Sequence, residues 1–145
     1  MSTEANKALV RRGYEEMVVG GNFDHLEEWF HDDYVDHTQP PDWPTDREGL
    51  RKLLEYFRSA FPDIHVTIED MVAEGDIVMH RQTMRGTHLG EFFGIPPTGR
   101  AVAMTGMHQW RFVDGKIIEH HANNDDLGML RQLGAIPSPV DATTG

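Results

Sequence analysis

The spacing of apolar residues divides the chain into a helical first part and a strand-rich second part. In the first twenty residues, apolar side chains recur at helical spacing, so we expect a helix from about Glu4 to Val19. Ser2 or Thr3 can cap its start, and the two glycines that follow Val19 end it.

Two further helices are predicted before the strong strands begin. A short helix follows Asn22 and carries Leu26 and Trp29. A longer helix, from Arg47 to Phe61, shows one apolar stripe and can be capped by Thr45 or Asp46. Residues 31–45, between these helices, are so rich in Pro and Asp that we expect an ordered loop without regular structure.

From Ile64 onward the apolar period changes to two, which is typical of β-strands. The pattern predicts strands from residue 64, over 77–85, over 100–113 and over 116–123, with turns at Gly75 and Gly115. A short helix over 127–133 and a loose tail over 136–145 complete one domain, residues 1–145. Helices followed by an antiparallel meander indicate an α+β fold, with three N-terminal helices on one face of a curved antiparallel sheet.

Alternation along the strands identifies polar residues that should face the interior. The inward set of the strand over 100–113 is Val102, Met104, His108, Trp110 and Phe112, and that of the preceding strand is Val78, His80, Gln82 and Met84. His108, His80 and Gln82 are therefore candidates to contact a ligand in an apolar pocket. The alternative for each is a hydrogen-bonded role inside the sheet.

Further candidates lie near the predicted rim of the pocket. His37 follows the second helix, and Tyr34 could shape the same rim or serve as a packing anchor. In the last strand, His121, Asn123 and Asp125 share one face, but alternation alone does not tell which face points inward. A carboxylate at the mouth of an apolar cavity would have a raised pKa and could transfer protons, whereas Asp125 or Asp126 could also simply cap the last helix.

Composition limits the possible partners. Thirteen basic and twenty-four acidic residues give a formal net charge of −11, which disfavours nucleic acid and anionic membranes and suits a neutral or apolar substrate. The absence of cysteine excludes disulfides and thiolate chemistry. The N-terminus lacks a signal-peptide pattern and no segment approaches about 20 consecutive apolar residues, so we expect a soluble cytoplasmic protein.

Several short motifs occur in a characteristic order: Tyr34-Val35-Asp36-His37, Phe61-Pro62-Asp63, the G-I-P-P-T-G run at 94–99, Arg111-Phe112 before Asp114-Gly115-Lys116, and Asp125-Asp126-Leu127-Gly128. With these motifs the chain resembles the SnoaL-like polyketide cyclases and ester cyclases of the nuclear-transport-factor-2-like superfamily, over nearly its whole length. The resemblance implies a cone-shaped α+β fold with a deep pocket and cofactor-free intramolecular aldol ring closure. It also implies that Asp125 is the catalytic acid and base, with Asp126 as the helix cap. Many similar sequences have Trp where this chain has His121, so the substrate cannot be transferred.

We therefore expect a cofactor-independent cyclase that acts on a polyketide-like carbonyl compound. Asp125 would move the proton while His108 assists, and His37, His80, Gln82, Trp110, His121, Asn123, Tyr34 and Met104 would bind substrate. The alternatives are a hydratase, isomerase or epoxide hydrolase that uses the same pocket, or a non-catalytic small-molecule binding protein.

No metal or cofactor is expected. His120 and His121 are adjacent strand residues, which point to opposite faces and cannot readily share an ion. We do expect a homodimer or homotetramer, because apolar residues on the outer face of the sheet form a candidate interface: Ile77, Met79, Ala103, Met107 and Ile118.

Overall fold

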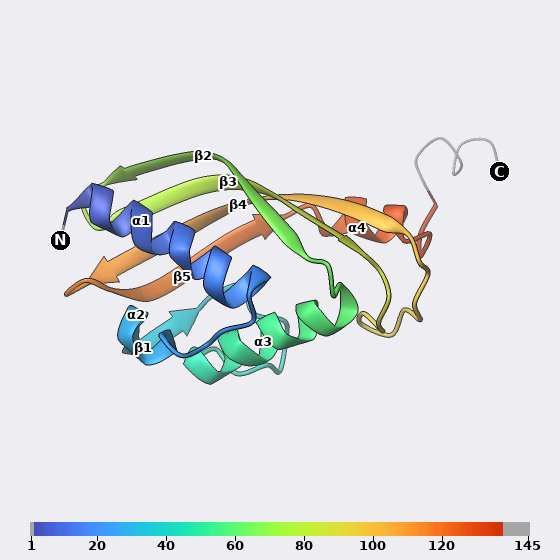
Figure 1. The fold of residues 1–145 in the computed structure, drawn as a ribbon, viewed down its shortest axis with the longest axis horizontal. Helices are drawn as coiled ribbons and strands as arrows, with labels where there is room; N and C mark the ends of the chain where they lie inside the picture. Colours follow the sequence, from blue (N-terminus) through green and yellow to red (C-terminus); the bar gives the residue numbers. More distant parts are fainter. Residues whose placement is uncertain (1, 138–145) are drawn as a thin grey trace.

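One curved five-stranded sheet forms the back of the molecule (Figure 1). The protein is seen here in a computed structural model that describes residues 2–137. Its strands are β1 (Phe30–Asp36), β2 (His65–Glu74), β3 (Ile77–Thr87), β4 (Ala101–Val113) and β5 (Lys116–Asn124), in the order β1-β5-β4-β3-β2. β2 to β5 form the predicted antiparallel meander, and β1 joins β5 in parallel, which makes the sheet mixed.

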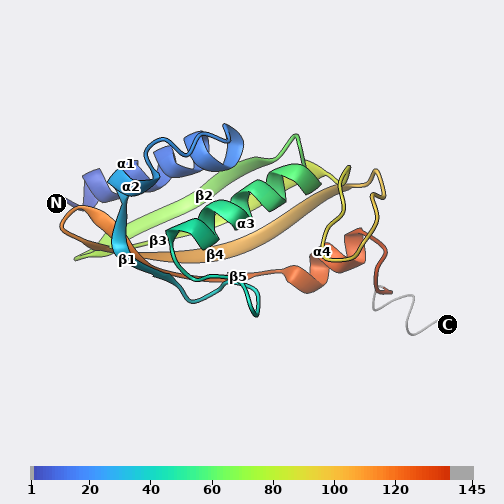
Figure 2. The same ribbon diagram turned by 90° about the horizontal axis from the view of Figure 1, so that it is seen from below.

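The helices lie mainly on one face of this sheet, as predicted. They are α1 (Thr3–Gly13), which continues as the π-helix η1 (Tyr14–Val19), α2 (Leu26–Trp29), α3 (Arg47–Ala60) and α4 (Asp126–Gln132). Figure 2 shows α1 and α3 covering the same face, with α4 beyond the end of β5. The caps follow the sequence: the Ser2 hydroxyl accepts the Ala5 N–H at 3.1 Å, and the Asp46 carboxylate accepts the Gly49 N–H at 2.9 Å.

The prediction of an irregular loop after the second helix was wrong at its start, because residues 30–36 form β1. Phe30, Tyr34 and Asp36 of this strand are buried, while His31, Asp32, Asp33 and Val35 are at least partly exposed. The aspartates suggested a loop, but they lie on the solvent side of an edge strand, where charge is tolerated. β1 therefore brings an acidic residue, Asp36, into the interior.

The inward faces of β3 and β4 are those predicted from alternation. Val78, His80, Gln82 and Met84 are buried on β3, and the even-numbered residues from Val102 to Phe112 are buried on β4. Asp114 and Gly115 both have positive φ, 51° and 78°, as the tight β4–β5 hairpin requires. His80, Gln82 and His108 thus face the helices.

Two further predictions concern the C-terminal tail and membrane-spanning segments. Residues 138–145, most of the predicted loose tail, lie outside the described residues. Among the helices in the described part, none is long and apolar enough to cross a membrane.

Candidate functional site

A cavity of about 140 Å³ lies between the helices and the inward face of the sheet. Its wall is mainly apolar, with side chains from α1, η1, α3 and all five strands. The polar residues in the wall are Tyr14, Asp36, Thr38, Gln82, His108, His120 and Asn124. Such a setting, apolar with a few convergent polar groups, is typical of small-molecule sites.

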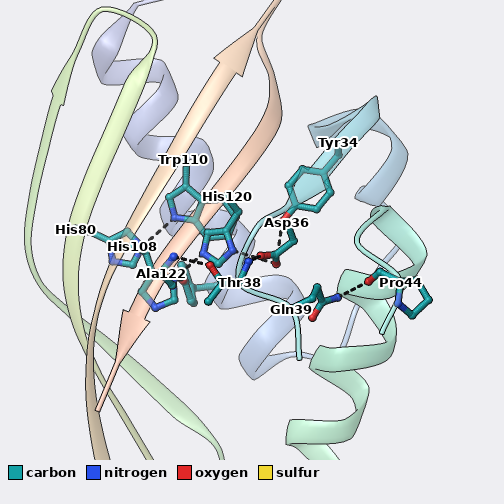
Figure 3. A network of polar contacts seen from close by, with 11 residues as sticks. Tyr34, Asp36, Thr38, Gln39, Pro44, His80, His108, Trp110, His120 and Ala122 are labelled. Carbon is teal, nitrogen blue, oxygen red and sulfur yellow. Dashed lines mark hydrogen bonds and ion pairs between the residues drawn. The ribbon is translucent and has the colours of Figure 1, made fainter. Parts of the chain in front are cut away.

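Four of these residues form a chain of polar contacts (Figure 3 shows its central part). The Asp36 Oδ2 atom lies 3.1 Å from His120 Nδ1, and His120 Nε2 lies 2.8 Å from His108 Nδ1. The Tyr14 hydroxyl lies 3.4 Å from the same His108 nitrogen. The parallel pairing of β1 with β5 sets Asp36 opposite His120, and β4 pairs with β5 so that His108 lies opposite Ala122.

The Asp36 carboxylate is held in place within the core. Asp36 is only 2% exposed. Its Oδ1 atom accepts the Thr38 N–H at 2.8 Å, and its Oδ2 atom accepts the Tyr34 hydroxyl at 3.3 Å. Burial alone would raise the pKa of Asp36, but the contact with His120 and the hydrogen bonds from Thr38 and Tyr34 outweigh it and lower the pKa. Asp36 is therefore a carboxylate near neutral pH.

The contacts determine which nitrogens carry protons. The 3.1 Å contact with the charged Asp36 carboxylate favours a proton on His120 Nδ1, although the two groups are not aligned as a hydrogen bond. His120 Nε2 can then accept from His108 Nδ1. That leaves His108 Nε2 as a bare acceptor, and among residues 2–137 it has no hydrogen-bond partner. Burial is the main cause that lowers the pKa of His108 well below its usual value. The imidazoles of His120 and His80 act in the same direction, because either would repel a charge on His108 once it is protonated itself. His108 is thus a neutral base whose opposite edge leads to a carboxylate, the arrangement in which a histidine takes up a proton.

The His80 ring packs against the His108 ring. The two imidazoles stack with their centroids 5.1 Å apart, and His80 Nε2 accepts the Trp110 indole N–H at 3.0 Å. Burial lowers the pKa of His80 to about 4, so this residue is neutral. It is a fixed partner of the site and not part of the cavity wall.

The side-chain amides of Gln82 and Asn124 belong to the same cavity wall as His108. The carbonyl oxygen of each amide is buried and has no hydrogen-bond partner in the described part of the chain. Gly106, opposite both Gln82 and Asn124 in the sheet, makes room for them, since a Cβ there would lie 2.1 Å from Asn124 Oδ1 and 3.4 Å from His108 Nε2. The result is a group of unpaired polar atoms next to the base.

The structure brings some predicted site residues together and separates others. Gln82, Met104, His108 and Trp110 line the cavity as expected. Tyr34 is buried beneath Asp36 and contacts the carboxylate, so of the two roles considered for it, the structure supports the packing anchor and not the rim residue.

Alternation left the inward face of β5 open, and the structure turns inward the face opposite to that of the chosen site residues His121, Asn123 and Asp125. His121, Asn123 and Asp125 are exposed, whereas His120, Ala122 and Asn124 line the cavity. His37 is exposed beside His121 and lies outside the cavity wall. The reason is the pairing with β1, which directs Asp36 and His120 inward together.

Asp125 occupies the capping position predicted for Asp126. Its Oδ1 atom accepts the Gly128 N–H at 2.9 Å, and its backbone begins α4. Asp126 is partly covered, and burial together with the charge of Asp125 raises its pKa. The catalytic role of Asp125 stays a prediction, but its exposed, capping position differs from the buried acid that we expected.

The sequence contained indications of the residues that were missed. Asp36 stands in the Tyr34–His37 motif, and His120 and Asn124 alternate on β5 with the residues that were chosen. Tyr14 belongs to the first predicted helix, whose apolar face it shares. These residues could be linked only once β1 was known to pair with β5.

Comparison with known proteins places the chain in a family. The family model described as SnoaL-like polyketide cyclase matches residues 8–133. The chain is 32% identical to the nogalonic acid methyl ester cyclase of Streptomyces nogalater over 131 residues, 83% of this chain and 91% of that protein. It is also 32% identical to an aklanonic acid methyl ester cyclase of Streptomyces peucetius over 137 residues, 92% of each chain.

Solved structures show the same fold. TsrD from Streptomyces laurentii has a TM-score of 0.85 at 28% identity, covering 94% of this chain and 99% of its own. IdmH from Streptomyces antibioticus has a TM-score of 0.77 at 38% identity, covering 88% and 97%. The chain therefore belongs to the SnoaL-like polyketide cyclase family. This confirms the predicted family, the α+β fold class and an enzyme of the cyclase type.

Proposed function

We propose that this protein closes a carbocyclic ring in a polyketide-derived carbonyl compound by an intramolecular aldol reaction, with His108 as the general base. The observation that carries the proposal is the contact chain from Asp36 through His120 to His108, which ends at an unpartnered Nε2 beside an apolar cavity. His108 would be the catalytic residue, and Asp36 and His120 would position it and stabilise its protonated form.

The reaction needs one proton moved out and one returned. His108 Nε2 takes a proton from a carbon between two carbonyl groups, and the resulting enolate carbon attacks an internal carbonyl carbon. The new alkoxide then recovers a proton from His108, so the product is an isomer of the substrate. We expect no cofactor, because every electron pair and proton in this sequence is supplied by the substrate and His108.

Negative charge develops on oxygen twice, on the enolate and on the alkoxide. The side-chain amides of Gln82 and Asn124 carry N–H donors beside His108, and Tyr14 offers a hydroxyl. A well-placed donor to such an oxygen contributes up to about 3 kcal/mol. The apolar wall of the cavity would fold the substrate so that the two reacting carbons meet.

The substrate class follows from the wall of the cavity and from the named relatives. The wall is mainly apolar and the chain carries a net charge of −11, so a neutral ligand is favoured over an anion. The two relatives described above carry the names of methyl ester cyclases, and a methyl ester is an uncharged derivative of a carboxylic acid. We therefore propose a neutral methyl ester of a polyketide acid as the substrate.

The experiment is a direct assay with purified protein. Nogalonic acid methyl ester and aklanonic acid methyl ester are incubated with the wild type and with His108→Ala, and products of unchanged mass are followed by chromatography. The proposal expects ring-closed isomers from at least one ester with the wild type and a loss of at least about 100-fold in His108→Ala. Ring closure at an undiminished rate by His108→Ala would overturn the role of His108, and water addition instead of isomerisation would overturn the reaction.

A further inference from the structure

We propose a divalent transition-metal site on the outer face of the β1–β5 pair, formed by His37, Glu119 and His121. One nitrogen of each imidazole and one oxygen of the carboxylate lie within 4.8 Å of one another. The site is distinct from the cavity, since none of the three residues lines it. We expected no metal from the sequence, because the adjacent residues His120 and His121 point to opposite faces. They do so, but Glu119 and His121 of β5 meet His37, which directly follows β1.

The three side chains already contact one another. His37 Nε2 lies 2.9 Å from Glu119 Oε2, and the rings of His37 and His121 are stacked with centroids 4.3 Å apart. The other Glu119 oxygen lies 3.4 Å from Arg111 Nε, and the charge of Arg111 is shared with Asp76. Glu119 is thus held by Arg111 at one oxygen while the other faces the two histidines.

The backbone behind the site is fixed by hydrogen bonds. The His37 N–H donates to the His120 carbonyl at 2.9 Å, and the Ala122 N–H donates to the Thr38 hydroxyl at 2.7 Å. These bonds bracket His121, so the Cα positions of the three proposed ligands are set by strand pairing. Only side-chain rotation is needed to bind an ion, because ligand atoms on a tetrahedral zinc are roughly 3.3 Å apart for bonds of about 2.0 Å.

The donor set selects the kind of ion. Two imidazoles with one carboxylate suit zinc, nickel or copper, whereas calcium and magnesium prefer oxygen ligands alone. Three protein ligands leave one position open on a tetrahedral ion. The strong net negative charge of the chain adds a general attraction for cations.

The location gives such an ion a structural effect. Asp36 directly precedes His37, and His120 stands between Glu119 and His121, so the ion would join β1 to β5 immediately behind the Asp36–His120 contact. Binding to the folded chain alone would stabilise that strand pair and raise the melting temperature. The cavity residues would keep their contacts, so a chelator should leave turnover unchanged.

The test is titration of the apo protein with zinc chloride by calorimetry at pH 7.5, together with thermal melts. We expect one zinc per chain, and binding at least about tenfold weaker in His37→Ala and in His121→Ala, since even outer-shell changes at metal sites cost 10–100-fold. The matched control is His65→Ala, an exposed histidine on β2 that should bind like the wild type. The zinc-induced rise in melting temperature should vanish with the same two variants.

Other results of the titration would contradict the proposed zinc site. Equal binding by wild type, His37→Ala and His121→Ala would overturn the site, as would the absence of binding at one equivalent. Loss of zinc in His108→Ala with no change in His121→Ala would place the ion in the cavity instead. His37 and His121 are exposed, so both variants are expected to fold, and circular dichroism without zinc verifies this.

Discussion

A buried imidazole serves as a base only if the positive charge it gains is compensated. Burial opposes that charge on His108 and lowers its pKa. The compensation comes from Asp36, which is ionised and reaches His108 through His120. This division of roles explains why a carboxylate is kept in the core, although an isolated buried charge is costly.

Gly106 provides a test of the amide group beside the base. In Gly106→Ala, the added methyl would lie 2.1 Å from Asn124 Oδ1, so the Asn124 side chain must move away from the cavity. Because a strand tolerates alanine, we expect the fold to be unchanged. We expect turnover to fall by at least about tenfold, because the displaced Asn124 amide would stabilise the negatively charged oxygen less well. The measurement is steady-state kinetics with the ester that the wild-type protein cyclises.

The control for this change is Thr105→Ala, the neighbouring residue whose side chain is exposed. It should retain wild-type turnover and melting temperature. If Gly106→Ala is as active as Thr105→Ala, the Asn124 amide has no part in the reaction.

At the scale of elements, most of the fold could be predicted because apolar periodicity and caps are local properties. α3 and β4 occur within one or two residues of their expected bounds, and Asp46 is one of the two caps proposed for α3. The sheet pairing of β1 could not be predicted, because its aspartates resemble a loop and its partner residues on β5 lie 84 to 87 positions later. The contact between Asp36 and His120 depends on that pairing, so both residues were missed.

The first helix shows another limit of periodicity. It was predicted as one helix, but its second part, Tyr14–Val19, is π-helical. Single π-turns are frequent at functional sites, and this one carries Tyr14, whose hydroxyl contacts His108. Arg58 of α3 donates to the carbonyls of Val18 and Val19 and so covers the end of this segment.

The cap of α3 yields a prediction of stability. Asp46→Ala removes the acceptor of the Gly49 N–H and should lower the free energy of unfolding by about 1 kcal/mol. Asp46→Asn keeps a side-chain acceptor and should differ from the wild type by only a few tenths of that. Urea unfolding followed by circular dichroism measures both, and equal loss in the two variants would mean that charge rather than capping is at work.

At the scale of the whole molecule, the buried histidines make stability depend on pH. The pKa of His80 is about 4 in the folded protein and about 6.5 when unfolded, so the unfolded chain binds more protons between these values. Its contribution is complete above pH 6.5 and falls as the pH is lowered. By pH 4 the loss should reach about 3 kcal/mol, and His108 acts in the same direction.

Urea unfolding at several pH values between 7.5 and 4 tests this dependence. The variant His80→Gln keeps an acceptor for the Trp110 N–H but does not titrate, so its curve should be flatter. An equally steep curve for this variant would assign the pH dependence to other groups.

The outer face of the sheet suggests that two copies associate. Val72, Met79 and Met107 are 67%, 41% and 55% exposed on β2, β3 and β4, and apolar groups of this kind often mark an interface. We expect a homodimer that Met107→Glu weakens strongly, because a two-fold contact contains the changed residue twice. Leu89→Glu, an exposed apolar residue outside the sheet, is the control, and light scattering that gives a monomer mass for the wild type would contradict the dimer.

One comparison of turnover decides which aspartate, Asp36 or Asp125, supports the chemistry of the whole molecule. In Asp36→Asn the amide can donate to His120 Nδ1, which reverses the tautomers and leaves a proton on His108 Nε2, so turnover should fall by at least about 100-fold in a folded protein. Asp125→Asn keeps an oxygen that can cap α4, so its turnover should stay within about threefold of the wild type. The opposite outcome, a loss of about 100-fold in Asp125→Asn with Asp36→Asn close to wild type, would contradict the role of the Asp36–His120–His108 chain and return the acid to Asp125.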